Sequence, residues 1–160
     1  MTDINLSQLK RVFPTSEPRR SPIAGKAAEV LVVGVDDWAI SEATAQLLAA
    51  GRKVHRCSDS VEAPFPCDAL VAGRGCPLDS GRVDAVLDVH SRPRSTLPLS
   101  EMGAICGLRE GLPLVIGGIS DGSILTAWAE QVPAGGDIVS SCDIAVAKSP
   151  WRSAEARETV

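Results

Sequence analysis

The stretch that decides the fold is "EVLVVGVDDWAISEATAQLLAAGRKVHRCSD", residues 29–59. It begins with a continuous apolar run, Val30 to Val33, bounded by Gly34, which is the pattern of a strand buried on both faces. The middle part places apolar residues at helical spacing and stops at Gly51, after which "KVHRCSD" alternates as a second strand. A strand, a helix and a strand of these lengths form a β-α-β unit with parallel strands.

The alternation of strands and helices continues along the chain. Apolar runs in "VDAVLDVH", "LPLVIGGIS" and "DIAVAK" predict three further strands. The stretches "LSEMGAICGLREG" and "GSILTAWAEQV" predict helices between them, the second with Ser123 as its N-cap and Pro133 beyond its end. The expected fold class is α/β, an open doubly wound parallel sheet of about five strands in a flavodoxin-like or receiver-like three-layer sandwich.

One segment interrupts this alternation, and both chain ends lie outside it. The stretch "VEAPFPCDALVAGRGCPLDSG" is rich in Pro, Gly and Cys, so we expect irregular structure in place of the second helix. Residues 1–28 lack sustained periodicity and are expected to form a flexible N-terminal tail. The predicted domain then spans residues 29–151, and residues 152–160 are expected to be a short helix or a frayed tail.

The composition restricts the classes of function. The chain of 160 residues has a formal net charge of −4, which argues against nucleic acid and anionic membranes as partners. No apolar run reaches the roughly 18 residues of a membrane span, and the N-terminus lacks the pattern of a secretory signal. We therefore expect a cytoplasmic protein. The scarcity of Lys among its basic residues, with abundant Ala, Gly and Val, hints at a GC-rich bacterial genome.

Polar side chains gather at the predicted carboxyl ends of the strands, where doubly wound sheets bind ligands. In chain order they are Asp36, Asp37, Asp88, Ser120, Asp121 and Lys148. Carboxylates placed close together are tolerated mainly when they share a cation or a proton, so Asp36, Asp37 and Asp88 would suit Mg²⁺. Lys148 would supply a compact positive charge opposite a phosphoryl oxygen.

These residues and their order resemble the receiver domain of bacterial response regulators. Residues 30–59 are similar to the family's first strand, acidic pair, helix and second strand; "VDAVLDVHSRP", "LPLVIGGIS" and "CDIAVAKSPW" are similar to its next three strands. The resemblance implies that Asp88 accepts a phosphoryl group, with Mg²⁺ held beside it by Asp36 and Asp37. It also implies that Ser120 and Lys148 hold that group and turn it into a surface change.

The resemblance implies a signalling module, rather than an enzyme, whose partner is a kinase or another regulatory protein. The sequence departs from the family pattern where Pro93 follows Asp88 by five residues instead of four, and where Ala145 replaces an aromatic switch residue. The alternative is therefore a divergent pseudo-receiver that binds its partner without phosphorylation. Simpler roles are a turn-capping Asp88 and first-turn helix acids at Asp36 and Asp37.

The five cysteines support an alternative function. They are Cys57, Cys67, Cys76, Cys106 and Cys142, and an odd number argues against a disulfide framework. Their spacing lacks the close C-x-x-C pair typical of metal sites. Nevertheless, Pro- and Gly-rich backbone is where a metal can replace missing secondary structure. The alternative is a metal or redox protein in which Cys57, Cys67, Cys76 and Cys106 hold Zn²⁺ or an Fe–S cluster, and inert buried thiols are the simpler interpretation.

Overall fold

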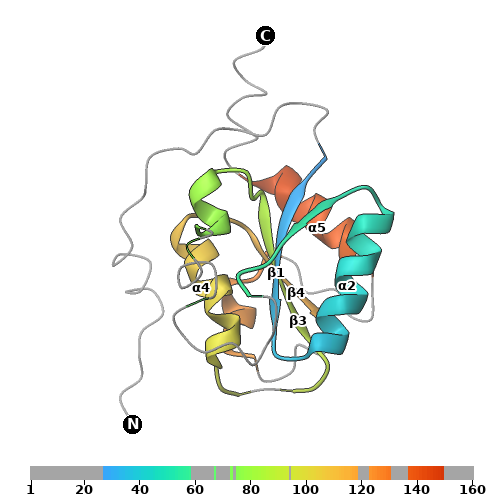
Figure 1. Cartoon of the computed structure of the whole chain (residues 1–160). Helices are drawn as coiled ribbons and strands as arrows, with labels where there is room; N and C mark the ends of the chain where they lie inside the picture. The colour runs from blue at the N-terminus through green and yellow to red at the C-terminus, as the bar shows by residue number, and fades with distance from the viewer. Residues whose placement is uncertain are drawn as a thin grey trace.

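Four parallel strands form the centre of the structure, a computed structural model that describes residues 27–58, 67, 73, 75–93, 95–118, 123–130 and 137–149. The strands are β1 (Glu29–Gly34), β2 (Lys53–His55), β3 (Ala85–His90) and β4 (Leu114–Gly118), in the order β2-β1-β3-β4. The α-helices in these residues are α2 (Asp37–Ala49), α4 (Met102–Arg109) and α5 (Ile138–Lys148) (Figure 1). Three 3₁₀ helices join them, η1 (Pro77–Ser80), η2 (Leu99–Glu101) and η3 (Ile124–Trp128). The α/β class is confirmed, and the strand order is compatible with a flavodoxin-like sandwich.

The sheet is buried on both faces. Successive strand side chains point to opposite faces, so the continuous apolar runs serve two cores at once. Helices α2 and α5 cover one face, and α4 with η1 and η3 covers the other (Figure 1). The first core contains Val30, Val32, Ile40, Ala43, Leu47, Leu87, Val89, Val115, Cys142 and Ala145. The second contains Leu31, Val33, Leu78, Val83, Val86, Ala104, Leu114, Ile116 and Leu125.

Helix α4 lies unusually close to the sheet because two glycines face it. A Cβ atom at Gly107 would lie 2.2 Å from Cγ2 of Val86, and one at Gly103 would lie 2.6 Å from Cγ1 of Val33. A Cβ at Gly103 would also lie 3.0 Å from the sulfur of Cys57. The spacing of four residues puts both glycines on one face of the helix. The helix therefore packs its backbone directly on β1, β3 and the residue that follows β2.

The predicted fifth strand is wrong. The stretch "DIAVAK" forms the second half of α5, and the residues described contain no strand after β4. Oδ1 of Asp137 accepts hydrogen bonds from the backbone N–H groups of Val139 and Ser140, at 3.0 and 3.1 Å, which caps the helix. The buried side chains of α5 recur at helical spacing; they are Ser141, Cys142, Ala145 and Val146. A helix therefore buries this segment better than a strand would.

The helix predicted over "GSILTAWAEQV" is a short 3₁₀ helix, η3, in the structure. Its N-cap was predicted correctly, since Oγ of Ser123 accepts a hydrogen bond from the backbone N–H of Leu125 at 3.3 Å. Pro133, residues 1–26 and 152–160 of the predicted tails, and most of the Cys-rich segment lie outside the described residues, so those predictions stay open. Ala28, the last residue of the predicted N-terminal tail, is buried beside β1. None of the described helices combines the length and apolarity needed to cross a membrane.

Candidate functional site

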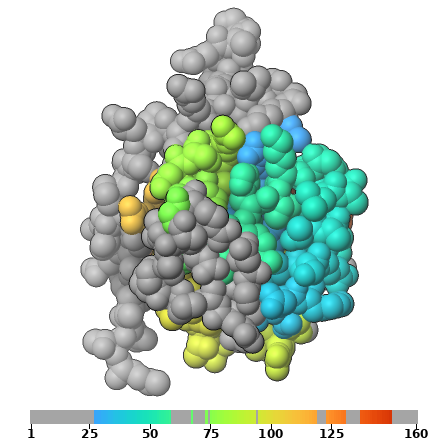
Figure 2. Space-filling view, in the orientation of Figure 1, coloured from blue at the N-terminus to red at the C-terminus, as the bar shows by residue number. Residues whose placement is uncertain are grey.

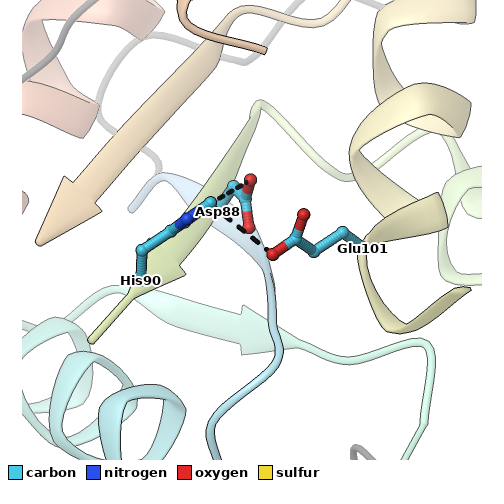
Figure 3. Close-up of side chains that lie close together, drawn as sticks. All are labelled: Asp88, His90 and Glu101. Atoms are coloured by element: carbon cyan, nitrogen blue, oxygen red, sulfur yellow. Dashed lines mark hydrogen bonds and ion pairs between the residues drawn. The ribbon is translucent and has the colours of Figure 1, made fainter. Parts of the chain in front are cut away.

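Asp88, His90 and Glu101 form a buried polar cluster between β3 and α4 (Figure 3). Asp88 and His90 are two residues apart in β3, so their side chains project from the same face of the sheet. Glu101 ends η2 and directly precedes α4. Its side chain points back toward the strand (Figure 3). The cluster therefore joins residues that lie far apart along the chain.

The distances within this cluster are short. Nε2 of His90 lies 2.8 Å from Oδ2 of Asp88 and 3.6 Å from Oε1 of Glu101. The side chains of Asp88, His90 and Glu101 are 0%, 1% and 2% exposed. Oδ1 of Asp88 has no hydrogen-bond partner among the described residues. Two carboxylates at such distances from one imidazole, all out of water, must share protons or a cation.

The cluster lies at the β1–β3 junction, near the carboxyl ends of the strands. Asp88 pairs in register with Val33 of β1 and Ile116 of β4, and β3 continues to His90. Asp88 is therefore an interior residue of the sheet, not a residue that caps the turn after it. Because residues two apart in a strand share a face, the sequence of β3 is enough to predict that His90 lies beside Asp88. Glu101 was not predicted as a site residue, because only the packing of α4 on β3 brings Glu101 to the site.

The acidic pair predicted to bind Mg²⁺ with Asp88 lies at the start of α2. Asp36 is the N-cap residue of α2, and its Oδ2 accepts a hydrogen bond from the hydroxyl of Ser91. Asp37 is exposed at the first position of α2, with Oδ1 4.0 Å from Nη2 of Arg56. Within the described part of the chain, neither carboxylate joins a metal-ligand group with Asp88. Their positions fit acids stabilised at a helix N-terminus.

Lys148 does not lie at the carboxyl ends of the strands, so that predicted location is wrong. Ile138, the first residue of α5, lies against Gly117 at the carboxyl end of β4. Asp143, further along α5, forms two hydrogen bonds with Arg52 just before β2, at 2.9 and 2.6 Å. The helix thus runs antiparallel to the strands, and Lys148 ends it, exposed, near the amino ends. Ser120 and Asp121 lie outside the described residues.

Four of the five cysteines lie near one another on the α4 side of the sheet. The pKa of Cys57 is raised to about 12, mainly by burial and in addition by the neighbouring thiols of Cys76, Cys67 and Cys106. Burial also raises the pKa of Cys106, as do the thiols of Cys76 and Cys67. Such mutual effects require short distances through space. Cys142 is separate, in the core between α2, α5 and the sheet.

The cysteines come from different elements. Cys57 follows β2, Cys76 directly precedes η1, and Cys106 belongs to α4. The segments around β2 and η1 are both visible on the face of the molecule that Figure 2 shows. Cys57 and Cys76 pack against the same apolar core as α4. All five thiols are free. Within the described residues, no three of the sulfur atoms lie within 4.8 Å of one another.

A pocket of about 190 Å³ opens at the carboxyl edge of the sheet. Its walls include Trp38, Val89, His90, Ser91 and Ile138. Trp38 is 70% exposed, and His90 belongs both to the pocket wall and to the buried cluster. The residues of α2 and α5 in this wall place the pocket on the α2–α5 side of the sheet, whereas the side chains of Asp88, His90 and Glu101 lie together on the α4 side.

Comparisons with protein-family models, with curated proteins and with solved structures found no match to this chain. Its function has to be inferred from the chemistry of the side chains that the fold brings together.

Proposed function

We propose that this chain is a cysteine-ligated metal protein, in which Cys57, Cys67, Cys76 and Cys106 hold a Zn²⁺ ion or an Fe–S cluster. The observation that carries the proposal is that Cys57 and Cys76 pack on the apolar core beside α4, the helix that carries Cys106, and that Cys67 lies near enough to raise the pKa of Cys57 and Cys106. Four thiolates are a complete ligand set for structural Zn²⁺ and for the common Fe–S clusters. The fifth cysteine, which lies in the other core, is not needed.

Metal binding requires these thiols to lose their protons. In the metal-free protein, burial is the main cause of the raised pKa values of Cys57 and Cys106, and repulsion between neighbouring thiolates adds to it. A bound cation reverses this effect and deprotonates its thiol ligands. Arg56 and Arg109 lower the pKa of Cys57 and Cys106 respectively, and they would offset the negative charge of a four-thiolate centre.

The geometry also indicates what the metal would do for the fold. Sulfur atoms bound to one Zn²⁺ lie about 3.8 Å apart, and no three of these sulfur atoms lie within 4.8 Å of one another in the described residues, so binding would draw the thiols closer together. A centre at this position would tie the residues after β2 and before η1 to α4. Cys106 is exposed, so oxidants and chelators can reach the centre. A stabilising metal and a redox-sensitive cluster are both compatible with this arrangement.

The geometry gives less support to the receiver-type function. A phosphoryl donor must reach the acceptor carboxylate, whereas Asp88 is fully buried beside His90. Phosphorylation at Asp88, with Mg²⁺ at Asp36 and Asp37, and the pseudo-receiver alternative both stay predictions from the sequence.

The proposal is tested by metal analysis of the full chain purified without oxygen. We expect about one Zn²⁺ ion or one Fe–S cluster per chain, the latter visible as a brown colour and as acid-labile sulfide. Cys57→Ala, Cys76→Ala and Cys106→Ala should each lose most of the metal. Cys142→Ala is the control, since it removes a buried thiol from the other core, and it should keep the metal.

Two results would overturn the proposal. One is a wild-type protein that contains neither Zn²⁺ nor iron and that also fails to develop thiolate-to-cobalt absorption when Co²⁺ is added after reduction. The other is equal metal content in wild type and in all three cysteine variants.

A further inference from the structure

We infer that Asp88, His90 and Glu101 form a second metal site, independent of the cysteines, which takes a divalent first-row cation such as Mn²⁺ or Fe²⁺. The ligand atoms would be Oδ2 of Asp88, Nε2 of His90 and Oε1 of Glu101. This site differs from the Asp36–Asp37–Asp88 site predicted from the sequence, because it shares only one residue with it.

The distances fit a shared ion. Two ligand atoms that each lie about 2.1 Å from one ion are separated by about 3.0 to 3.4 Å in octahedral or tetrahedral geometry. The separations from Nε2 of His90 are 2.8 Å to Asp88 and 3.6 Å to Glu101, and all three atoms lie within 4.8 Å of one another. The two distances from Nε2 of His90 therefore need to change by only a few tenths of an ångström to fit an ion, and the two carboxylates lie no more than 4.8 Å apart.

Burial supplies the second, independent observation. Asp88 is 0% exposed, and its Oδ1 atom has no hydrogen-bond partner among the described residues, although buried carboxylate oxygens are rarely left unsatisfied. A cation beside Oδ2 would stabilise the whole carboxylate, since both oxygens carry its charge.

Binding is an exchange of the ion for a proton. The hydrogen bond between Asp88 and His90 holds one proton between Oδ2 and Nε2. The ion takes the place of that proton, which leaves to solvent, and the Nε2 lone pair then binds the ion. Two ionised carboxylates with one neutral imidazole carry two negative charges, which a divalent ion balances.

The choice of ligands separates this site from the cysteine centre. Carboxylates suit Mn²⁺, whereas thiolates favour zinc and iron–sulfur clusters. Mn²⁺ therefore probes the Asp88–His90–Glu101 cluster in the intact protein, and its binding can be lost or kept independently of the metal that the cysteines hold.

The test is a titration of the full chain with Mn²⁺, followed by the loss of the paramagnetic resonance signal of the free ion. We expect about one bound Mn²⁺ per chain, and binding weakened by about tenfold or more in Asp88→Asn and in Glu101→Gln. Asp37→Asn is the control and should bind Mn²⁺ as wild type does.

Unchanged binding in Asp88→Asn and Glu101→Gln would overturn the inference, as would absence of binding to wild type. A loss in Asp37→Asn as large as that in Asp88→Asn would move the ion to the acidic pair and overturn it too. If the substitutions prevent folding, the site is tested by thermal unfolding of the wild-type protein with Mn²⁺. A ligand of the folded state raises the melting temperature as its concentration increases, so a melting temperature unaffected by Mn²⁺ would refute the site.

Discussion

Nε2 of His90 lies 2.8 Å from Oδ2 of Asp88, inside the protein and on the same face of β3. Strand geometry alone brings these two side chains together, because residues two apart share a face. Asp88 and His90 are thus neighbours as soon as β3 forms, whereas Glu101 comes close to them only when α4 packs on the sheet. The energetic importance of the pair can be measured directly.

We predict strong coupling between Asp88 and His90 in the free energy of unfolding. His90→Ala leaves the buried Asp88 carboxylate without its imidazole partner and should cost about 3 to 5 kcal/mol in metal-free buffer. Adding Asp88→Ala to that variant should cost much less than Asp88→Ala alone, with a coupling of about 1 kcal/mol or more. Urea unfolding of the four proteins measures the cycle, and purely additive effects would contradict the prediction.

The two glycines of α4 give a matched pair of variants. Gly107→Ala places a methyl group against Val86 and should destabilise the protein by about 1 to 3 kcal/mol, although alanine normally favours a helix. Gly103→Ala should cost a similar amount, but it also displaces the sulfur of Cys57. We therefore expect only Gly103→Ala to reduce Zn²⁺ or cluster content. Thermal unfolding and metal analysis separate the two effects, and a stabilised Gly107→Ala would refute the close packing.

The raised pKa values of two thiols predict that the free energy of unfolding decreases at alkaline pH. Burial raises the pKa of Cys57 and of Cys142 from 9.0 to about 12. In the unfolded chain these thiols ionise near pH 9, whereas in the metal-free folded protein they stay protonated until about pH 12. The free energy of unfolding should therefore be unaffected by them below pH 9 and fall as the pH rises from about 9 to about 12.

Cys142→Ala should make this decline shallower, because one of the two thiols no longer titrates. A bound metal should remove the contribution of Cys57, since a ligating thiolate has already lost its proton. Chemical unfolding at several pH values, with and without metal, measures both effects. A decline equally steep in wild type and Cys142→Ala would show that this thiol is not the cause.

Secondary structure was predicted correctly where the hydrophobic pattern fits only one kind of element, and wrongly where the pattern fits both a strand and a helix. Val30 to Val33 were predicted correctly as a strand, because a parallel strand buried on both faces requires an unbroken apolar run. The run "DIAVAK" was wrongly predicted to be a strand, since six residues are too few to distinguish a strand from a buried helix by periodicity. The capping residue Asp137 lies six residues before the start of this run, so the run itself contains no helix signal.

The residues of the candidate sites could likewise be predicted from the sequence only in part. His90 could be placed beside Asp88 from sequence, because the distance between them depends only on β3. Glu101 and the converging cysteines could not, because their positions depend on how α4 crosses the sheet. The closeness of that crossing depends on Gly103 and Gly107, whose meaning becomes visible only against the side chains that they contact.

The absence of a strand beyond β4 in the described residues leaves β4 at the edge of the sheet. Exposed sheet edges invite other chains to add a strand, which is a route to aggregation. Here the backbone N–H of Glu130, just after η3, donates a hydrogen bond of 2.7 Å to the carbonyl of Leu114, at the start of β4. At its other end β4 stops at Gly118, whose φ of 81° turns the backbone away from extended geometry. The protein thus blunts this edge at both ends, which disfavours its growth into an intermolecular sheet.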